Sequence, residues 1–330
     1  MNPLVSLISP CYNGANYLRP FLESVVSQTY HNIEFIFVDD GSTDNTKEIL
    51  FSYKSKFEEN GIKLCYIYKE NGGQASAINA ALPIFSGEFL MWCDSDDILL
   101  PENIEKKVSF LEKHSECGFV LSHGVAVSNT SLNVPLWHLG RKVTAENDDL
   151  FADLIFERNV VYVPATILVR REVFLSAIPT LTIYEGKQGQ NWQLMLPLAY
   201  NSKAGYLEDV LFKYVIHSDS HSHKKLSYEE QIKRDNDFEL LIITTIASIP
   251  DISTDEVNRW YRSVRIKYLR QKLRHSFDYL KIKESREYKK ELMQYDSLTI
   301  EDIMIIYLFY KFVRKIKYRP KRKNKEYVTY

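Results

Sequence analysis

The chain has 330 residues, of which 45% are hydrophobic and 26% are charged, and its formal net charge at pH 7 is −1. These values are ordinary for a folded globular protein and exclude a disordered or collagen-like chain, and the length exceeds that of most single domains. The four cysteines are widely spaced and form no CxxC pair, which indicates reduced, buried thiols.

The near neutrality conceals a basic carboxyl terminus. Residues 311–330 contain nine Lys or Arg and one Glu, a net charge of about +8, so residues 1–310 carry about −9. Such a cluster favours contact with phosphate groups of lipid or nucleic acid, although a solvated tail has the same composition. No apolar run reaches the roughly 18 residues that span a membrane, and no secretion signal precedes the first strand. We therefore expect a cytoplasmic chain.

The first hundred residues alternate short apolar segments with helical patterns. The predicted strands cover residues 4–9, 33–39, 62–68 and 88–94. The predicted helices between them cover residues 17–28, 43–60 and 73–85. This alternation predicts the α/β class, with a doubly wound, mainly parallel sheet and helices on both faces.

The pattern loosens after residue 97. We predict helices over 102–114 and 190–200, and strands over 118–128, 160–171 and 209–217. Residues 129–149 are polar and give no clear pattern. From about Leu226 onward the sequence is helical and charged, so a domain boundary is expected near residues 222–226.

Ligands of parallel α/β sheets bind beyond the carboxyl ends of the strands, so the residues that follow each strand are candidates for a site. Asp39 and Asp40 end the second strand and can accept hydrogen bonds from a uracil ring or a ribose, or cap the next helix. Tyr12, after the first strand, can stack on a base or simply pack. GxGxxG and GxxxxGK[ST] motifs are absent from the sequence, which argues against dinucleotide-binding and P-loop proteins.

Three carboxylates follow the fourth strand, at Asp94, Asp96 and Asp97. Like charges repel one another, so this crowding indicates a bound divalent cation, and oxygen ligands suit Mg²⁺ or Mn²⁺. The alternative is that Asp97 caps the helix that follows, but a cap needs one acid and not three.

Five segments together resemble the family 2 glycosyltransferases with the GT-A fold, over roughly residues 3–222. They are "PLVSLISPCYNGANYL", "IEFIFVDDGSTDNT", "NGGQASAIN", "GEFLMWCDSDD" and "YVIHSDSHS". The resemblance implies a catalytic domain over residues 1–224, with a nucleotide-sugar half at 1–100 and an acceptor half at 101–224. The helical region 225–330 would follow it. The implied reaction transfers a sugar from a nucleotide-sugar donor, expected to be UDP-linked, to a hydroxyl with inversion.

The resemblance also implies roles for individual residues. The donor nucleotide would be held by Pro10, Tyr12, Asp39, Asp40, Asn79 and Asp94. Mn²⁺ or Mg²⁺ would be bound by the DxD pair Asp94 and Asp96, with Asp97 and His217 as further ligands. The diphosphate or the acceptor would be contacted by Gln190, Trp192, Ser220 and His221.

The sequence departs from the family at the general base. Many relatives carry Glu-Asp-Trp where this chain has Gln190, Asn191 and Trp192, and an amide cannot accept the proton. Glu185 in the preceding loop is one candidate for the base. Glu208 or Asp209 is another, and a chain that binds sugar nucleotides without catalysis is the third interpretation.

The last helical segment is unusual. Residues 303–310 are apolar around the whole helix and lead into the basic terminus, a pattern that suits a helix lying in a membrane surface. A core helix followed by a basic tail is the alternative. Membrane attachment would suit a glycan or lipid-linked glycan acceptor, as in bacterial polysaccharide assembly. We do not expect nucleic acid as a partner, because the tail lacks interleaved stacking aromatics.

Overall fold

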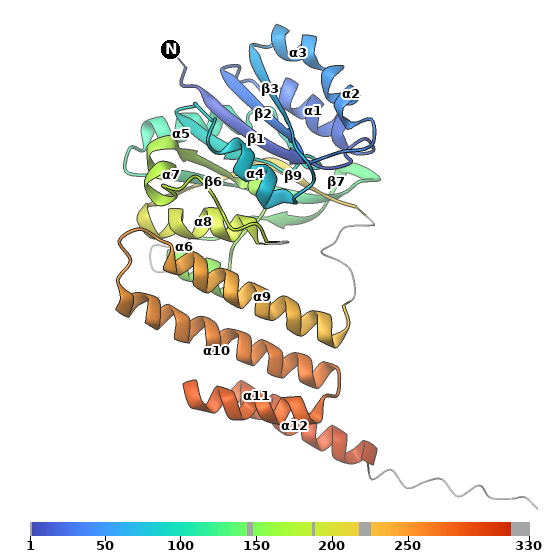
Figure 1. Cartoon of the computed structure of the whole chain (residues 1–330), viewed down its shortest axis with the longest axis vertical. Coiled ribbons are helices and arrows are strands. Elements are labelled where there is room, and N and C mark those ends of the chain that lie inside the picture. Colours follow the sequence, from blue (N-terminus) through green and yellow to red (C-terminus); the bar gives the residue numbers. More distant parts are fainter. Residues whose placement is uncertain (1, 144–147, 187–188, 218–225, 318–330) are drawn as a thin grey trace, which may run out of the picture. The chain divides into compact units, whose positions relative to one another are not determined.

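The computed structural model describes residues 2–143, 148–186, 189–217 and 226–317. Contacts within the chain divide it into two compact units (Figure 1). The first unit comprises Met1–Lys224 with Leu240–Val257, and the second comprises Lys225–Glu239 with Asn258–Tyr330. The first unit contains the sheet and the second is helical.

A nine-stranded sheet forms the centre of the first unit. Its strands are β1 (Val5–Cys11), β2 (Ile33–Asp39), β3 (Ile62–Tyr68), β4 (Phe89–Trp92), β5 (Ile98–Leu99), β6 (Phe119–Ser128), β7 (Ser131–Leu139), β8 (Ile167–Arg170) and β9 (Ala204–Ile216). They are ordered β3-β2-β1-β4-β8-β6-β9-β5, with β7 paired to β6. Neighbours among β1 to β4 are parallel, β6 is parallel to β9, and β5, β7 and β8 run antiparallel to their neighbours. The predicted α/β class and mainly parallel sheet are confirmed.

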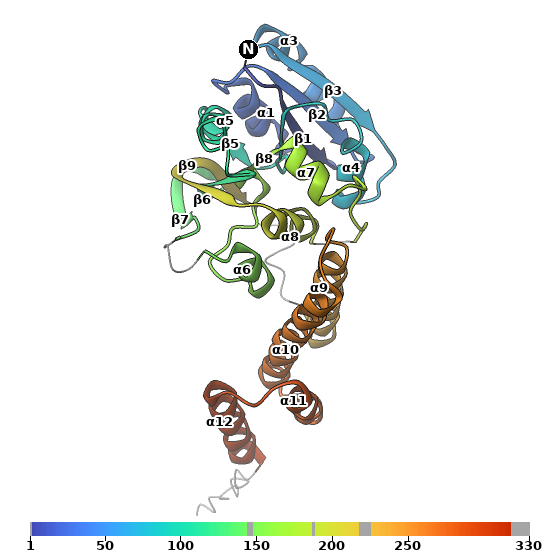
Figure 2. The same ribbon diagram turned by 90° about the vertical axis from the view of Figure 1, so that its left-hand side faces the viewer.

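Helices cover this sheet, as Figures 1 and 2 show from two directions. They are α1 (Leu18–Val26), α2 (Thr46–Phe51), α3 (Lys54–Glu59), α4 (Gln74–Ala81), α5 (Asn103–Lys113), α6 (Leu150–Phe156), the short 3₁₀ turn η1 (Pro164–Thr166), α7 (Arg171–Ala177) and α8 (Gln190–Asn201). All seven residues of β1 and of β2 are buried, because both faces of these strands are covered. Their apolar side chains form the core, and polar groups gather where the strands end.

The second unit consists of helices, which confirms the helical carboxyl-terminal region. The helices after the sheet are α9 (Tyr228–Ala247), α10 (Thr254–Asp278), α11 (Ile282–Tyr295) and α12 (Ile300–Lys317), and α9 contributes residues to both units. A separate apolar core joins α10, α11 and α12 through Leu269, Leu273, Phe277, Leu292, Ile306 and Phe309. Within the described ranges, no helix has the length and apolarity that a membrane crossing requires. Most of the basic terminus, residues 318–330, lies outside the described residues.

Candidate functional site at the carboxyl ends of the strands

The three predicted carboxylates converge on the turn that follows β4. Oxygens of Asp94, Asp96 and Asp97 lie within 4.8 Å of one another. Asp97 is fully buried, and its Oδ1 accepts a hydrogen bond from the backbone N–H of Val215 in β9 (3.0 Å). Its Oδ2 is also buried and has no hydrogen-bond partner among the described residues. Asp97 does not cap α5, whose cap position is Glu102, so the capping interpretation is wrong.

Burial and mutual repulsion raise the pKa values of this cluster. Burial and the neighbouring charge of Asp96 raise the pKa of Asp94 to about 7. Burial raises the pKa of Asp96, and burial together with the charges of Asp96 and Asp94 raises the pKa of Asp97 well above its ordinary range. Three carboxylates that repel one another, of which Asp97 is buried with one oxygen lacking a partner among the described residues, fit a hard divalent cation. His217 lies beside the cluster, with its Nε2 3.8 Å from Asp96 Oδ2.

The end of β2 is tied to the glycine-rich loop that precedes α4. Asp40 is buried, and its Oδ1 accepts from Lys69 Nζ (2.7 Å) while its Oδ2 accepts from the N–H of Gly73 (2.7 Å). Asp39 Oδ1 accepts from the Ser42 N–H (2.8 Å), and its Oδ2 accepts from the Tyr66 hydroxyl (2.9 Å). Both predicted nucleotide residues therefore order loops at this edge of the sheet, and their contact with a nucleoside stays a prediction.

Tyr12 and Pro10 lie at the carboxyl end of β1. Pro10 is buried within the strand, whereas the Tyr12 side chain is 48% exposed and free to stack on a planar group. Asn13, next to Tyr12, adopts a left-handed conformation with φ of 51°. Its side-chain oxygen accepts from the Thr43 N–H (2.9 Å), and its own N–H donates to Ser42 Oγ (2.9 Å). The loops after β1 and β2 are thereby held against each other.

A chain of amides connects the carboxylate cluster to the start of α8. Gln74, the first residue of α4, donates from its Nε2 to Asp94 Oδ1. Its Oε1 accepts from Gln190 Nε2 (2.5 Å), and Gln190 is the first residue of α8. The sequence analysis missed Gln74, although its place directly after Gly72-Gly73 at the carboxyl edge of the sheet could have indicated it.

The side chain of Asn191 is engaged on both sides. Its Oδ1 accepts from the indole of Trp92 (3.3 Å), and its Nδ2 donates to the carbonyl of Tyr162 (2.8 Å). Trp192 is 9% exposed, donates its indole N–H to the Leu154 carbonyl (3.0 Å) and packs on the Tyr162 ring at 4.7 Å between centroids. These contacts fix the first turn of α8, and a role for Trp192 as an acceptor contact stays a prediction.

The other end of α4 reaches the loop that contains Glu185. Asn79 accepts from the N–H of Ile183 (2.8 Å) and donates to its carbonyl (2.8 Å). The same amide donates to Glu185 Oε1 (3.2 Å), and Glu185 is exposed. Asp209, a rival for the general base, instead forms an ion pair with Lys106 of α5 (2.7 Å). Glu185 thus contacts α4 through Asn79, and the first residue of the same helix, Gln74, contacts the carboxylate cluster.

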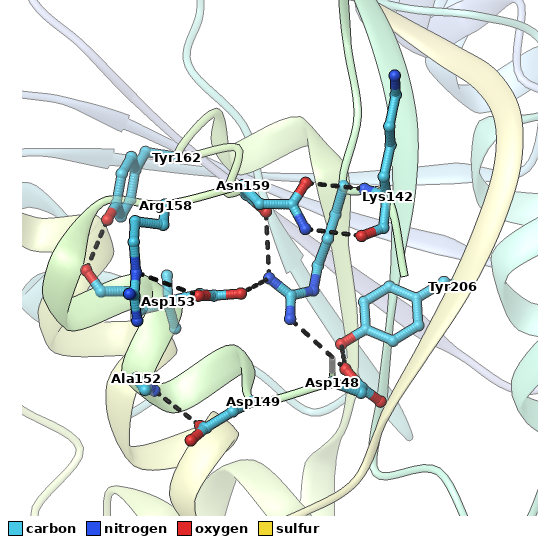
Figure 3. A network of polar contacts seen from close by, with 11 residues as sticks. Lys142, Asp148, Asp149, Ala152, Asp153, Arg158, Asn159, Tyr162 and Tyr206 are labelled. Atoms are coloured by element: carbon cyan, nitrogen blue, oxygen red, sulfur yellow. Dashed lines mark hydrogen bonds and ion pairs between the residues drawn. The ribbon is translucent and has the colours of Figure 1, made fainter. Parts of the chain in front are cut away.

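A buried ion pair joins α6 to the segments around it. Arg141 is 5% exposed, and its Nη1 donates to Asp153 Oδ2 of α6 (2.6 Å) and to the Asn159 carbonyl (3.1 Å). Asp148 Oδ1 lies 3.6 Å from Nη2 and accepts from the Tyr206 hydroxyl (2.6 Å), so the network spans α6 and β9 (Figure 3). Sequence reasoning missed this network, because Arg141 and Asp148 lie in the polar stretch 129–149, which gives no clear pattern, and Tyr206 is distant along the chain.

Two predicted contacts, Ser220 and His221, lie outside the described residues. His217 is the last described residue before that gap, and its ring lies 5.7 Å from that of Tyr17.

Comparison with known proteins gives consistent results. The sequence profile of the family described as Glycosyl transferase family 2 matches residues 6–176. An uncharacterized glycosyltransferase of Rickettsia prowazekii (strain Madrid E) is 46% identical over 112 residues, which are 34% of this chain and 33% of that protein. The chain spans about a third of the length of the first curated relatives that it matches.

Two solved structures share the fold. Staphylococcus aureus TarS 1-349 in complex with UDP-GlcNAc has a TM-score of 0.60 and 20% identity, over 88% of this chain and 81% of that one. The mannosyltransferase PcManGT from Pyrobaculum calidifontis, in complex with GDP-Man and Mn²⁺, has a TM-score of 0.56 and 15% identity, over 97% and 82%. Because the family profile covers more than half of the sequence and the GT-A fold agrees with it, the chain belongs to glycosyl transferase family 2.

Proposed function

We propose that this chain is a metal-dependent, inverting glycosyltransferase of the hexosyltransferase class. It moves a sugar from a UDP-linked donor to a hydroxyl of a glycan or lipid-linked glycan. The observation that carries the proposal is the cluster of Asp94, Asp96 and Asp97, which the amide chain through Gln74 connects to α8. The nucleotide sugars in the TarS and PcManGT complexes support the class of donor.

The cluster and its neighbour are the proposed metal site. Asp94, Asp96 and Asp97 would hold Mn²⁺ or Mg²⁺, with His217 beside Asp96 as a further ligand. Bound there, the cation supplies Lewis-acid stabilisation of the negative charge that develops on a departing nucleoside diphosphate. Asp97 is anchored to β9 through the Val215 N–H, and its other oxygen is buried without a hydrogen-bond partner among the described residues.

The nucleoside is proposed to lie across the carboxyl ends of β1 and β2. The exposed ring of Tyr12 would stack on the base above the buried Pro10. Asp39 and Asp40 would accept from the base and the ribose with lone pairs that remain beside their present hydrogen bonds. Asn79 would close the pocket from α4, since it already positions the loop at Ile183.

Glu185 is the proposed general base. It is exposed and ionisable, and Asn79 holds its carboxylate next to the helix that carries Gln74. It would take the proton of the acceptor hydroxyl while that oxygen attacks the anomeric carbon and the diphosphate leaves. Gln190, Asn191 and Trp192 would shape the acceptor side, and Ser220 and His221 would contact the diphosphate. The sites divide over the proposed domains, 1–224 for catalysis and 225–330 for the helical region.

The experiment is to incubate the purified chain with Mn²⁺ and UDP-, GDP- and dTDP-sugars. Release of nucleoside diphosphate, or a raised melting temperature that requires metal, is the expected result for at least one donor. Asp94→Asn together with Asp96→Asn should abolish both signals. If no nucleotide sugar binds in the presence of metal, the proposal is lost.

A second candidate function is sugar-nucleotide binding without catalysis. Asn191 favours it, because both ends of this amide are already occupied by Trp92 and Tyr162 and cannot act as a base. Glu185→Gln separates the two candidates. Under the enzyme proposal, this variant lowers the turnover rate by about two to four orders of magnitude and leaves the donor affinity unchanged. An unchanged rate would eliminate Glu185 as the base.

The proposed place of action is the cytoplasm, peripherally at the inner face of the cell membrane, in polysaccharide assembly. The net charge of about +8 on residues 311–330 supports attraction to anionic lipid. The acceptor would then be a lipid-linked glycan presented at that surface. A preference for lipid-linked over free acceptor in the same assay is the expected result.

A further inference from the structure

The outward side of α12 is apolar. Six large side chains on this helix are between 53% and 80% exposed, namely Ile300, Ile303, Met304, Tyr307, Leu308 and Phe312. Their spacing of three, four, seven, eight and twelve residues from the first places them on one face of a helix. Contiguous exposed apolar surface of this kind marks an interaction site and not an ordinary solvated helix.

The opposite side of α12 is packed and its orientation is fixed. Ile306 and Phe309 are buried in the core of the second unit. Asp302, at the start of the helix, accepts from Arg270 Nε of α10 (3.0 Å) and from the Thr299 N–H (3.0 Å). Thr299 Oγ1 accepts in turn from the Asp302 N–H (3.1 Å), which completes a capping box. Rotating α12 to bury its outer face would break these contacts, so the apolar face is built to stay outward.

Basic side chains border this face. An open groove of about 560 Å³ is lined by Arg286, Lys289, Lys290, Met293 and Tyr310, which belong to α11 and α12. The Arg286 guanidinium lies 6.0 Å from the centre of the Tyr310 ring.

The charge continues along α12 itself. Lys311 places its Nζ 5.5 Å from the ring centre of Tyr307, on the apolar face. Glu301, an exposed acid at the start of the helix, is neutralised by Arg274 (2.5 Å). In the sequence, eight further Lys or Arg follow Lys311 before residue 326.

We propose that this face of α11 and α12 docks on the surface of an anionic lipid bilayer. Cores of protein interfaces are depleted in Lys, whereas apolar side chains beside several cations match the acyl boundary and phosphates of a membrane. The helix lies in the plane of the surface, with Ile303, Tyr307 and Leu308 entering the acyl boundary and Arg286 and Lys290 on the phosphates. No crossing of the bilayer is needed.

The inference names a surface of the second unit and does not depend on sugar transfer. Residues 303–310 are apolar around the whole helix, and the structure divides them between two surroundings. Ile306 and Phe309 are buried in the core, Ile305 and Tyr310 pack against it, and Ile303, Met304, Tyr307 and Leu308 are exposed. Each basic residue near an anionic surface contributes about fivefold to affinity, and a buried apolar side chain adds a comparable or larger factor.

The test is co-sedimentation of the full chain with phosphatidylcholine vesicles, with and without phosphatidylglycerol. The double variant Ile303→Ser with Leu308→Ser should lose at least tenfold in affinity for the anionic vesicles. The matched control is Val134→Ser with Leu136→Ser on β7 of the first unit, two side chains of similar exposure, which should bind as the wild type does.

A charge variant tests the border of the face. Arg286→Gln, Lys289→Gln and Lys290→Gln together should weaken binding at least tenfold at low salt, and by less at high salt, because ionic strength screens exposed charges. None of these three side chains is a member of the apolar core of the second unit, so the circular dichroism spectrum should be unchanged.

Three results would overturn the inference. They are equal binding to neutral and anionic vesicles, wild-type binding by the Ile303→Ser and Leu308→Ser variant, or a wild-type dimer that this variant dissociates without any vesicle binding. The last result would assign the face to a second copy of the chain. Nucleoside diphosphate release with a water-soluble acceptor should be the same in all these variants, so failure of docking and failure of the proposed activity are distinguishable.

Discussion

At the scale of single residues, the carboxylate cluster controls how pH affects metal binding. The pKa of Asp94 is raised to about 7 by burial and by the charge of Asp96, so below pH 7 the metal-free cluster retains a proton. A divalent cation binds the deprotonated form and must displace that proton. Affinity should therefore fall as the pH drops below 7 and level off above it.

The expected result is that Mn²⁺-dependent UDP binding is roughly tenfold weaker at pH 6 than at pH 8, the factor for one proton displaced from a group with a pKa near 7. Isothermal titration calorimetry at both pH values measures it, with metal-free UDP binding as the reference. A pH-independent metal contribution would show that Asp94 carries no proton that the metal must displace.

The amide chain gives a second prediction at this scale. Gln74→Ala removes the hydrogen-bond donor to Asp94 and the acceptor for Gln190. A hydrogen bond to a charged group contributes about 1.5–3 kcal/mol, so metal-dependent nucleotide affinity should fall at least tenfold. The same titration measures it, and Gln294→Ala, at an exposed glutamine on α11, is the matched control. Wild-type affinity in the Gln74 variant would contradict a role for the chain of amides.

At the scale of elements, the position of α6 depends on a buried cation. Asp153→Ala leaves the 5% exposed guanidinium of Arg141 without its shortest ion pair, and removing one partner of a buried pair costs about 3–5 kcal/mol. Asp148→Ala should cost much less, because Asp148 lies 3.6 Å away and is 38% exposed. Urea denaturation measures both variants, and equal costs would refute the central role given to Asp153.

The elements also show how far the sequence predicts the fold. The strands at 33–39 and 62–68 have the predicted bounds. The first is an apolar run buried along its whole length, and the second is a run of apolar and aromatic residues although most of its side chains are only partly buried. The expected helix 43–60 divides into α2 and α3, since Ser52 and Tyr53 form a turn between them. The hairpin strand β7 was missed because it pairs with β6 alone and its side chains face solvent, so it carries no alternating pattern.

The site was predicted in part for the same reason. The acids after β2 and β4 stand out because charge directly after a buried run has few explanations, and the register of the parallel strands brings their ends together. Gln74 and Arg141 do not stand out. Their roles depend on partners 116 positions (Gln190) and 12 positions (Asp153) along the chain, which only the tertiary structure brings into contact.

At the scale of the whole molecule, the division into two compact units predicts that a bound donor stabilises the first unit and leaves the second unchanged. The residues proposed for the nucleotide and metal all belong to the first unit, whereas α11 and α12 belong to the second and have their own apolar core. A ligand that binds the native state of one unit stabilises that unit by mass action and leaves the opening of an independent core unchanged.

Hydrogen exchange measured by mass spectrometry, with and without UDP and Mn²⁺, tests this prediction. Exchange should slow around residues 39–44, 69–74 and 94–97, where backbone N–H groups such as those of Ser42 and Gly73 already support the site. Exchange in α11 and α12 should not change, because their core contacts lie within the second unit. Asp94→Asn with Asp96→Asn is the control, in which the added ligands should protect neither unit. Protection that spreads to α12 in the wild type would mean that the two units open together. Binding at the sugar-nucleotide site would then also stabilise the helix that carries the apolar face.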